Sequence, residues 1–159
     1  MLKINEILQS VKSGKISTKD AKKLLTLYSI EEVENFAKID VNRSQRRGVP
    51  EVIFAETKEF DDIKKIIKKT LEKTNLVLVS RIKKDDYKKL ILFVKKLNVK
   101  IETGRNSSTI LIFKKPIKFQ DGKVGILTAG TSDIGVAEEA RIMCQAMNCQ
   151  CITSYDVGV

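Results

Sequence analysis

The sequence of 159 residues contains no histidine and only three cysteines, Cys144, Cys149 and Cys151. Zinc centres are built mainly from cysteine and histidine, so this chain lacks the residues to complete one. A nucleophilic cysteine needs a neighbouring base or a lowered pKa, and the sequence identifies no such partner. We therefore assign no catalytic residue and expect all three cysteines to be small buried hydrophobes.

The odd number of cysteines has a second consequence. Without a secretory leader, three clustered cysteines do not predict a disulfide framework. We therefore expect a reducing, cytoplasmic compartment.

Aromatic residues are also scarce, at 6% of the chain, and they are scattered. Single-stranded nucleic acids bind to platforms of aromatic rings, and the sequence predicts no such platform. The longest apolar run is far shorter than the roughly 20 residues of a membrane-spanning helix, so we expect no membrane partner. The remaining composition, with 42% hydrophobic and 31% charged residues, is that of an ordinary globular protein.

Charge is strongly one-sided, at +10 with a pI near 9.5. Such a charge favours anionic partners, among them nucleotides, nucleic acids and acidic membrane surfaces. The lysines alternate with acidic residues in stretches such as KKIIKKTLEK and RIKKDDYKKL, which is typical of the solvated faces of amphipathic helices. We favour a solvated lysine-rich surface over a polyanion site, and nucleic acid is not the expected partner.

The first part of the chain has helical periodicity interrupted by turn residues. Apolar spacing predicts helices over 3–12, 18–27 and 31–38, with a break at Gly14 and an N-cap at Ser17 or Thr18. A strand is expected in GVPEVIFA, followed by helices near 59–72 and 84–97 and strands near 75–80, 99–104 and 108–113. The connection GRNSS is hairpin-like. These elements predict a small N-terminal helical and α+β domain over 1–117 with up to four strands.

Residues 114–122 read as a linker, because Pro116 and an Asp-Gly pair interrupt any periodicity. A second unit over 118–159 then begins with strand KVGILTA, loop GTSD, a helix near 134–147 and strand CQCITS. This order predicts the first βαβ part of a doubly wound parallel sheet. The fold class is therefore α/β, and the second domain is expected to be incomplete, because such sheets usually have about four to six strands.

The loop of the second unit is the first candidate binding site. Ligands gather where parallel strands end and a helix begins, because the helix presents unpaired N–H groups there. Gly130 allows close backbone approach or positive φ, Thr131 and Ser132 supply hydroxyls, and Asp133 can bind ribose hydroxyls or Mg2+. The alternative is that Thr131, Ser132 or Asp133 only caps the helix. The loop matches neither the Walker pattern nor the dinucleotide glycine fingerprint.

A second candidate lies in IDVNRSQRRGVPE. Three arginines follow Asp40 at spacings of three and four, so on a helix they would share a face: Arg43, Arg46 and Arg47. Guanidinium groups bind phosphates and carboxylates bidentately, which suits an anion site that also includes Glu51. The alternative is a structural ion pair between Asp40 and Arg43 or Arg47.

Taken together, these motifs resemble the LarB family, which makes the precursor of the nickel-pincer nucleotide cofactor. The resemblance rests on AKIDVNRSQRRGVPEVIFAETK, VGILTAGTSDIGVAEEAR and YDVGV, and it covers nearly the whole chain. It includes Lys58, Arg81 and the loop from Thr128 to Asp133. The second domain is similar to the AIR carboxylase (PurE) fold, and Ser132 and Asp133 match the end of its first loop.

The resemblance implies an enzyme that carboxylates and hydrolyses nicotinic acid adenine dinucleotide, with CO2 as co-substrate and Mg2+ as cofactor. The products are the dicarboxylated pyridinium mononucleotide and AMP, and the protein is expected to be a homo-oligomer. The family's thiolate comes from a cysteine near its C-terminus, beyond residue 159 here, so we expect a truncated chain that is inactive alone. The alternatives are an AIR carboxylase or mutase of purine biosynthesis, acting on aminoimidazole ribonucleotide, and a non-catalytic polyanion-binding module.

Overall fold

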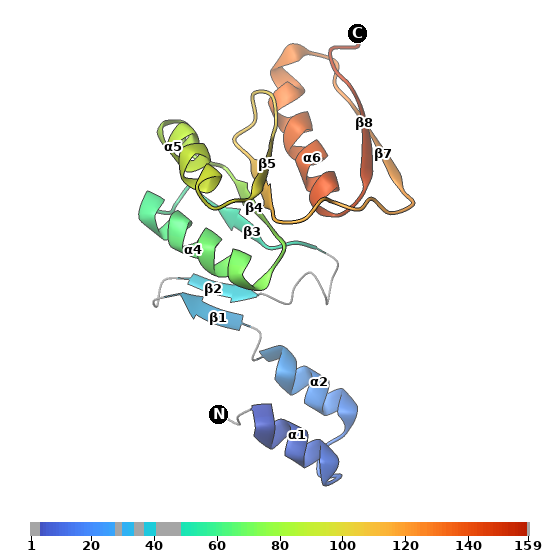
Figure 1. Ribbon diagram of the computed structural model, residues 1–159. Helices are drawn as coiled ribbons and strands as arrows, with labels where there is room; N and C mark the ends of the chain where they lie inside the picture. Colours follow the sequence, from blue (N-terminus) through green and yellow to red (C-terminus); the bar gives the residue numbers. More distant parts are fainter. Residues whose placement is uncertain (1–3, 28–29, 34–36, 41–48, 159) are drawn as a thin grey trace.

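The computed structural model describes residues 4–27, 30–33, 37–40 and 49–158 (Figure 1). The helices are α1 (Ile4–Lys12), α2 (Thr18–Leu27), α4 (Phe60–Lys73), α5 (Lys84–Lys95), the 3-10 turn η1 (Thr131–Asp133) and α6 (Ile134–Ala146). The strands are β1 (Ile30–Val33), β2 (Ala37–Asp40), β3 (Val52–Phe54), β4 (Leu76–Ser80), β5 (Lys100–Thr103), β6 (Ile110–Phe113), β7 (Lys123–Leu127) and β8 (Gln150–Ser154). None of these helices is long and apolar enough to cross a membrane.

The chain begins with a helical hairpin, as expected. Helices α1 and α2 pack together, and Ile7 and Ala21 are buried. Of the two possible caps, Ser17 is the one that caps α2. Its Oγ accepts a hydrogen bond from the Asp20 backbone N–H at 3.1 Å and donates one to the Asp20 carboxylate at 2.6 Å. Gly14 has φ +70°, the left-handed conformation that ends a helix.

The prediction of a helix over 31–38 is wrong. Strands β1 and β2 form an antiparallel hairpin there, in which Ile30 pairs with Asp40 and Val33 with Ala37. Two runs of four residues are too short for periodicity to distinguish a helix from a strand. The β-branched residues Ile30, Val33 and Ile39 favour strands once a pairing partner is present.

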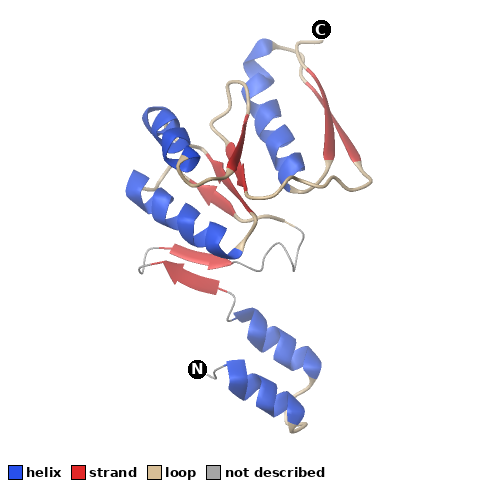
Figure 2. Ribbon diagram, viewed as in Figure 1, coloured by secondary structure: helices blue, strands red, loops and turns tan. Residues whose placement is uncertain are grey.

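The expected α+β arrangement over 49–113 is confirmed. Four strands form a mixed sheet in the order β3-β4-β6-β5, with β3 and β4 parallel and the other pairs antiparallel. Helix α4 makes the crossover that a parallel pair requires, and the GRNSS turn joins β5 to β6. Figure 2 shows the alternation of helices and strands along this part of the chain.

Helices cover both faces of this sheet. On one face α4 and α5 bury an apolar cluster whose largest members include Ile63, Ile67, Leu90 and Ile112. On the other face Leu78 and Leu111 pack against Ile142 and Ala146 of α6. The strands β4 and β6 are therefore almost entirely inaccessible to solvent.

The last part of the chain forms the expected βαβ unit. Strands β7 and β8 are parallel, with Lys123 opposite Gln150 and Leu127 opposite Ser154, and α6 connects them. Helix α6 contacts both β7–β8 and the four-stranded sheet, so it lies between the two sheets (Figure 1). The boundary after residue 117 stays a prediction: residues 114–122 form neither helix nor strand, and Ile117 packs on the same cluster as α6.

Candidate functional site

The loop Thr128 to Asp133 leaves the carboxyl end of β7 and turns through η1 into α6. The segment that follows β8 holds its first residues in place. The backbone N–H of Asp156 donates to Thr128 Oγ1 at 3.2 Å, and that of Val157 donates to the Thr128 carbonyl at 3.0 Å. Thr128 is buried, so the loop is anchored at its base and is exposed beyond it.

The side chains of the loop do not cap the helix. Thr131, Ser132 and Asp133 are exposed, and neither Gly130 nor Asp133, at the two N-cap positions, makes a side-chain cap hydrogen bond. Ser132 Oγ instead donates to the Asp133 carboxylate at 3.3 Å. The capping alternative is therefore wrong, and the polar groups of the loop are available to a ligand.

Gly130 does not use the positive φ that was considered for it. Its φ is −125°, which any residue can adopt. A Cβ atom built at Gly130 would meet nothing closer than Ser132 Oγ, at 3.8 Å. The space beside this backbone is open, which permits the close approach of a ligand.

Asp133 supplies the carboxylate of this site. Mg2+ usually binds one or two carboxylates together with water and substrate phosphates, and the loop offers one exposed aspartate for such a role. Within the described part of the chain, no group of three or more cysteine, aspartate and glutamate side chains forms a metal site. Any Mg2+ held here would therefore depend on the phosphates of its ligand.

Behind the loop, Glu138 of α6 is a buried carboxylate with several donors. Arg141 donates to it from Nε at 2.9 Å and from Nη2 at 2.8 Å, and the Tyr155 hydroxyl donates at 2.5 Å. Burial raises the pKa of Glu138, but the hydrogen bonds from Arg141 and Tyr155 outweigh burial, so the pKa is lowered overall. Arg141 also pairs with Glu102 of β5 at 2.9 Å. This network ties α6 to β5 and to the segment after β8.

Two glycines let the β5–β6 connection approach α6. A Cβ atom at Gly135 would lie 2.5 Å from the Asn106 carbonyl oxygen, and one at Gly104 would lie 2.7 Å from Glu138 Cβ. Both distances are too short for any larger residue without movement of its neighbours. The first turn of α6, and with it the loop, is therefore fixed against the four-stranded sheet.

A second polar group lies where β3 and β4 end. Arg81 has φ +55°, its Nη1 lies 3.3 Å from Glu56, and its guanidinium lies over the Phe54 ring at 5.7 Å. Next to it, Ser80 Oγ donates to Glu139 of α6 at 2.5 Å. The carboxyl end of β4 therefore lies beside the N-terminal half of α6.

Sequence reasoning assigned no role to Arg81 or Lys58, although both are among the residues on which the resemblance to LarB was based. In the structure Lys83, two residues after Arg81, donates a hydrogen bond from Nζ to the Lys58 carbonyl at 3.2 Å. Five described non-glycine residues have positive φ, and Arg81 is the one among them that is neither Asn nor Asp. Strained backbone of this kind clusters at active sites and ligand clamps, and nothing in the sequence signals it.

The structure describes only part of the arginine cluster. Asp40 is the last residue of β2 and not part of a helix. The prediction that Asp40 shares a helical face with the arginines is therefore wrong. Arg43, Arg46 and Arg47 lie outside the described residues, and so does any ion pair with Asp40. Glu51 is partly buried just before β3, where its carbonyl accepts a hydrogen bond from the Leu78 N–H at 3.3 Å.

The cysteines lie away from the loop. Cys144 is in the last turn of α6, Cys149 precedes β8 and Cys151 is near the start of β8, whereas the loop is at the opposite end of the unit. All three thiols are free and partly exposed, so the expectation of full burial is wrong. Burial, followed by the neighbouring Cys144 thiol, raises the pKa of Cys151, which makes it a poor nucleophile at neutral pH.

Comparison with known proteins identifies the family. Residues 30–112 match the model of the LarB/PurE-like N-terminal domain. The chain is also similar to the uncharacterized protein MJ0165 of Methanocaldococcus jannaschii, with 40% identity over 160 residues. That match covers 98% of this chain but 62% of the relative, so the chain spans less than two thirds of the relative's length. Just over half of the chain lies within the matched domain, and the chain belongs to the LarB/PurE-like family.

Proposed function

We propose that this chain is part of a LarB-type enzyme that carboxylates and hydrolyses nicotinic acid adenine dinucleotide. The products would be the pyridinium-3,5-dicarboxylate mononucleotide and AMP. Family membership supports the relationship to LarB, and the substrate and reaction are the proposal. The observation that carries it is the open, hydroxyl-bearing loop at the carboxyl end of β7, whose side chains have no structural task in capping α6.

In this proposal the loop binds the phosphate or ribose part of the dinucleotide. Thr131 and Ser132 donate hydrogen bonds to phosphate oxygens, and the first N–H groups of α6 add a partial positive charge. Asp133 accepts hydrogen bonds from ribose hydroxyls or holds Mg2+, which would supply positive charge near the phosphoanhydride. The Glu138 network keeps the first turns of α6 in position.

The carboxylation step needs a thiolate. A pyridinium ring is electron-poor and does not attack CO2 until a thiolate adds to it and forms an enamine-like dihydropyridine. Cys144 lies eleven residues after Asp133, about 16 Å along α6, and Cys149 and Cys151 lie at that same distant end. We therefore propose that the chain binds the dinucleotide but does not turn it over by itself. A homo-oligomer, to which the exposed Leu127 and Ile152 of β7 and β8 would contribute, belongs to the same proposal.

The matched N-terminal domain favours this reading over an AIR carboxylase. The AIR carboxylase alternative explains only the second unit, whereas the matched model describes an N-terminal domain over 30–112 that lies before that unit. Aminoimidazole ribonucleotide is therefore the control ligand.

Calorimetric titration of the full chain with nicotinic acid adenine dinucleotide and Mg2+ tests binding. We expect Ser132→Ala and Asp133→Asn each to weaken binding about tenfold through lost hydrogen bonds. Asp121→Asn, an exposed change in the same unit, should have no effect. Absence of binding, or tighter binding of aminoimidazole ribonucleotide, would refute the proposal.

An assay of AMP release tests the claim that the chain is inactive alone. We expect no AMP when bicarbonate is added to the chain with dinucleotide and Mg2+. If AMP is released, and Ser132→Ala abolishes that release, the claim is refuted.

A further inference from the structure

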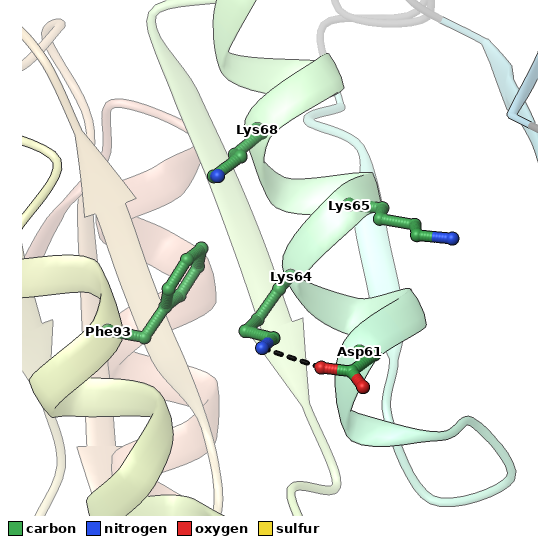
Figure 3. Close-up of a pocket in the computed structure, with 5 residues that line it drawn as sticks. All are labelled: Asp61, Lys64, Lys65, Lys68 and Phe93. Carbon is green, nitrogen blue, oxygen red and sulfur yellow. Dashed lines mark ion pairs between the residues drawn. The ribbon is translucent and has the colours of Figure 1, made fainter.

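A lysine-lined hollow lies between α4 and α5, on the face of the four-stranded sheet opposite to α6. It has a volume of about 330 Å3 and is lined by Asp61, Lys64, Lys65, Lys68 and Phe93, a size at the lower end of ligand pockets. Figure 3 shows Lys64 and Lys68 extending from α4 toward the Phe93 side, while Lys65 points away. The whole sheet separates this hollow from the loop at Gly130, so the two are distinct.

Aromatic rings position the lysine side chains of the hollow. Lys64 Nζ lies 5.1 Å from the centre of the Phe60 ring and 5.9 Å from that of Phe93, and Lys68 Nζ lies 5.7 Å from the Phe93 ring. Lys89 of α5 lies 5.9 Å from the Phe60 ring. A cation–π contact attracts an ammonium group without neutralising it. The ammonium groups are therefore partly ordered before any anion binds.

The charges around the hollow are not balanced. Helix α4 carries five lysines and three acidic residues, and α5 carries four lysines and two acidic residues. Asp61 pairs with Lys64 at 2.6 Å and Asp86 with Lys89 at 3.2 Å. Lys68 has no carboxylate partner among the residues that the structure describes. An anion that entered the hollow would therefore meet positive charge in excess.

The spacing indicates the kind of anion. Lys64 and Lys68 are four residues apart on one helix, which separates them by about 6 Å along its axis. A ligand that contacts both ammonium groups while each side chain stays beside its own turn of the helix carries anionic oxygens on more than one centre, and lysine commonly binds phosphate as a point charge. We propose that the hollow between α4 and α5 binds a chain of linked phosphate groups, either inorganic or carried by a nucleoside diphosphate.

Tripolyphosphate, orthophosphate and ADP are titrated separately into the 15N-labelled full chain, with binding followed by NMR. We expect tripolyphosphate to saturate one site, with shifts at α4 and α5, and to bind more tightly than orthophosphate. Lys64→Ala/Lys68→Ala should weaken this binding about tenfold or more. The control Lys19→Ala/Lys22→Ala removes two exposed lysines from α2 and should change it less than about twofold. Phe93→Leu removes the ring and should weaken binding about threefold.

The other results decide between ligands or overturn the proposal. If Lys64→Ala/Lys68→Ala weakens ADP binding, the ligand of the hollow is the phosphate chain of a nucleotide. If only Ser132→Ala weakens ADP binding, the ligand of the hollow is an inorganic phosphate chain. Equal losses in both double variants, or no saturable tripolyphosphate binding, would overturn the proposal, as would tighter, steeply salt-dependent binding of a single-stranded oligonucleotide. Circular dichroism of each variant excludes unfolding as the cause.

Discussion

The four-stranded sheet and the β7–β8 pair differ in how completely their faces are covered. In the four-stranded sheet, Val77, Val79 and Leu111 are 0% exposed, because helices pack on both sides. In the β7–β8 pair, Leu127 is 73% exposed and Ile152 is 63% exposed, because α6 covers only the inner face. Parallel strands are normally buried on both faces. In the four-stranded sheet the apolar residues contribute mainly to stability, whereas in the β7–β8 pair part of the apolar surface is exposed.

The largest expected difference between the two sheets is in core truncation. Leu111→Ala in β6 should lower the free energy of unfolding by about 2 to 5 kcal/mol, because it leaves a cavity between the sheet and α6. Ile152→Ala on the outer face of β8 should lower it by less than about 1 kcal/mol. Urea unfolding measures both changes. Equal losses would mean that the outer face of β7–β8 is covered in solution.

The second-largest effect on stability is expected at Glu138, in the polar contact between the four-stranded sheet and the β7–β8 unit. Glu138→Gln should destabilise the fold by about 2 to 4 kcal/mol, because it removes the charge that Arg141 and Tyr155 are arranged to bind. Glu72→Gln, on the exposed side of α4, should change stability by less than about 0.5 kcal/mol.

The pH dependence of stability gives a second test of Glu138. Its pKa is lowered from 4.5 in the folded state, so its contribution is complete above 4.5 and is lost as the pH falls through the folded-state pKa. The difference between wild type and Glu138→Gln should therefore shrink in acid. A difference that is constant between pH 7 and pH 3 would show that packing, and not charge, explains the loss.

A smaller effect is expected from two glycines. Gly135→Ala would ordinarily stabilise a helix, but its methyl group would lie 2.5 Å from the Asn106 carbonyl oxygen, so we expect a net loss of about 1 to 3 kcal/mol. A Cβ atom at Gly125 of β7 would meet nothing within 4 Å, and Gly125→Ala should be neutral or slightly stabilising. Thermal unfolding distinguishes the two. A stable Gly135→Ala protein would mean that the β5–β6 connection can move away from α6.

The smallest effect compares two serines near helix starts. Ser17→Ala removes the cap of α2 and should cost about 1 kcal/mol. Ser132→Ala removes a hydroxyl that caps nothing and should change stability by less than about 0.5 kcal/mol, while it weakens dinucleotide binding. Chemical unfolding and ligand titration of both variants test this contrast. A Ser132→Ala variant that is as destabilised as Ser17→Ala would restore a capping role for the loop.

Sequence reasoning was successful where an element carries its own signal. The strands β4, β6, β7 and β8 and the helices α4, α5 and α6 were predicted near their observed positions, because apolar runs and helical spacing are local patterns. The hairpin of β1 and β2 was missed, since its strands are short and their pairing is not a local property. Lys58 and Arg81 were noted as motif residues, but nothing in the sequence showed that Arg81 has positive φ beside Glu56 and Phe54.

The sequence by itself determined the α/β class, the order of most elements, the family resemblance and the position of the loop at Gly130, because these depend on residue type and spacing. Only the tertiary structure decided that α6 covers the second face of the four-stranded sheet. It also decided that Glu138 is buried between Arg141 and Tyr155, and that the loop side chains leave the helix uncapped. These features depend on contacts between residues far apart in the chain, where packing and hydrogen-bond geometry select one arrangement among many that the same local patterns allow.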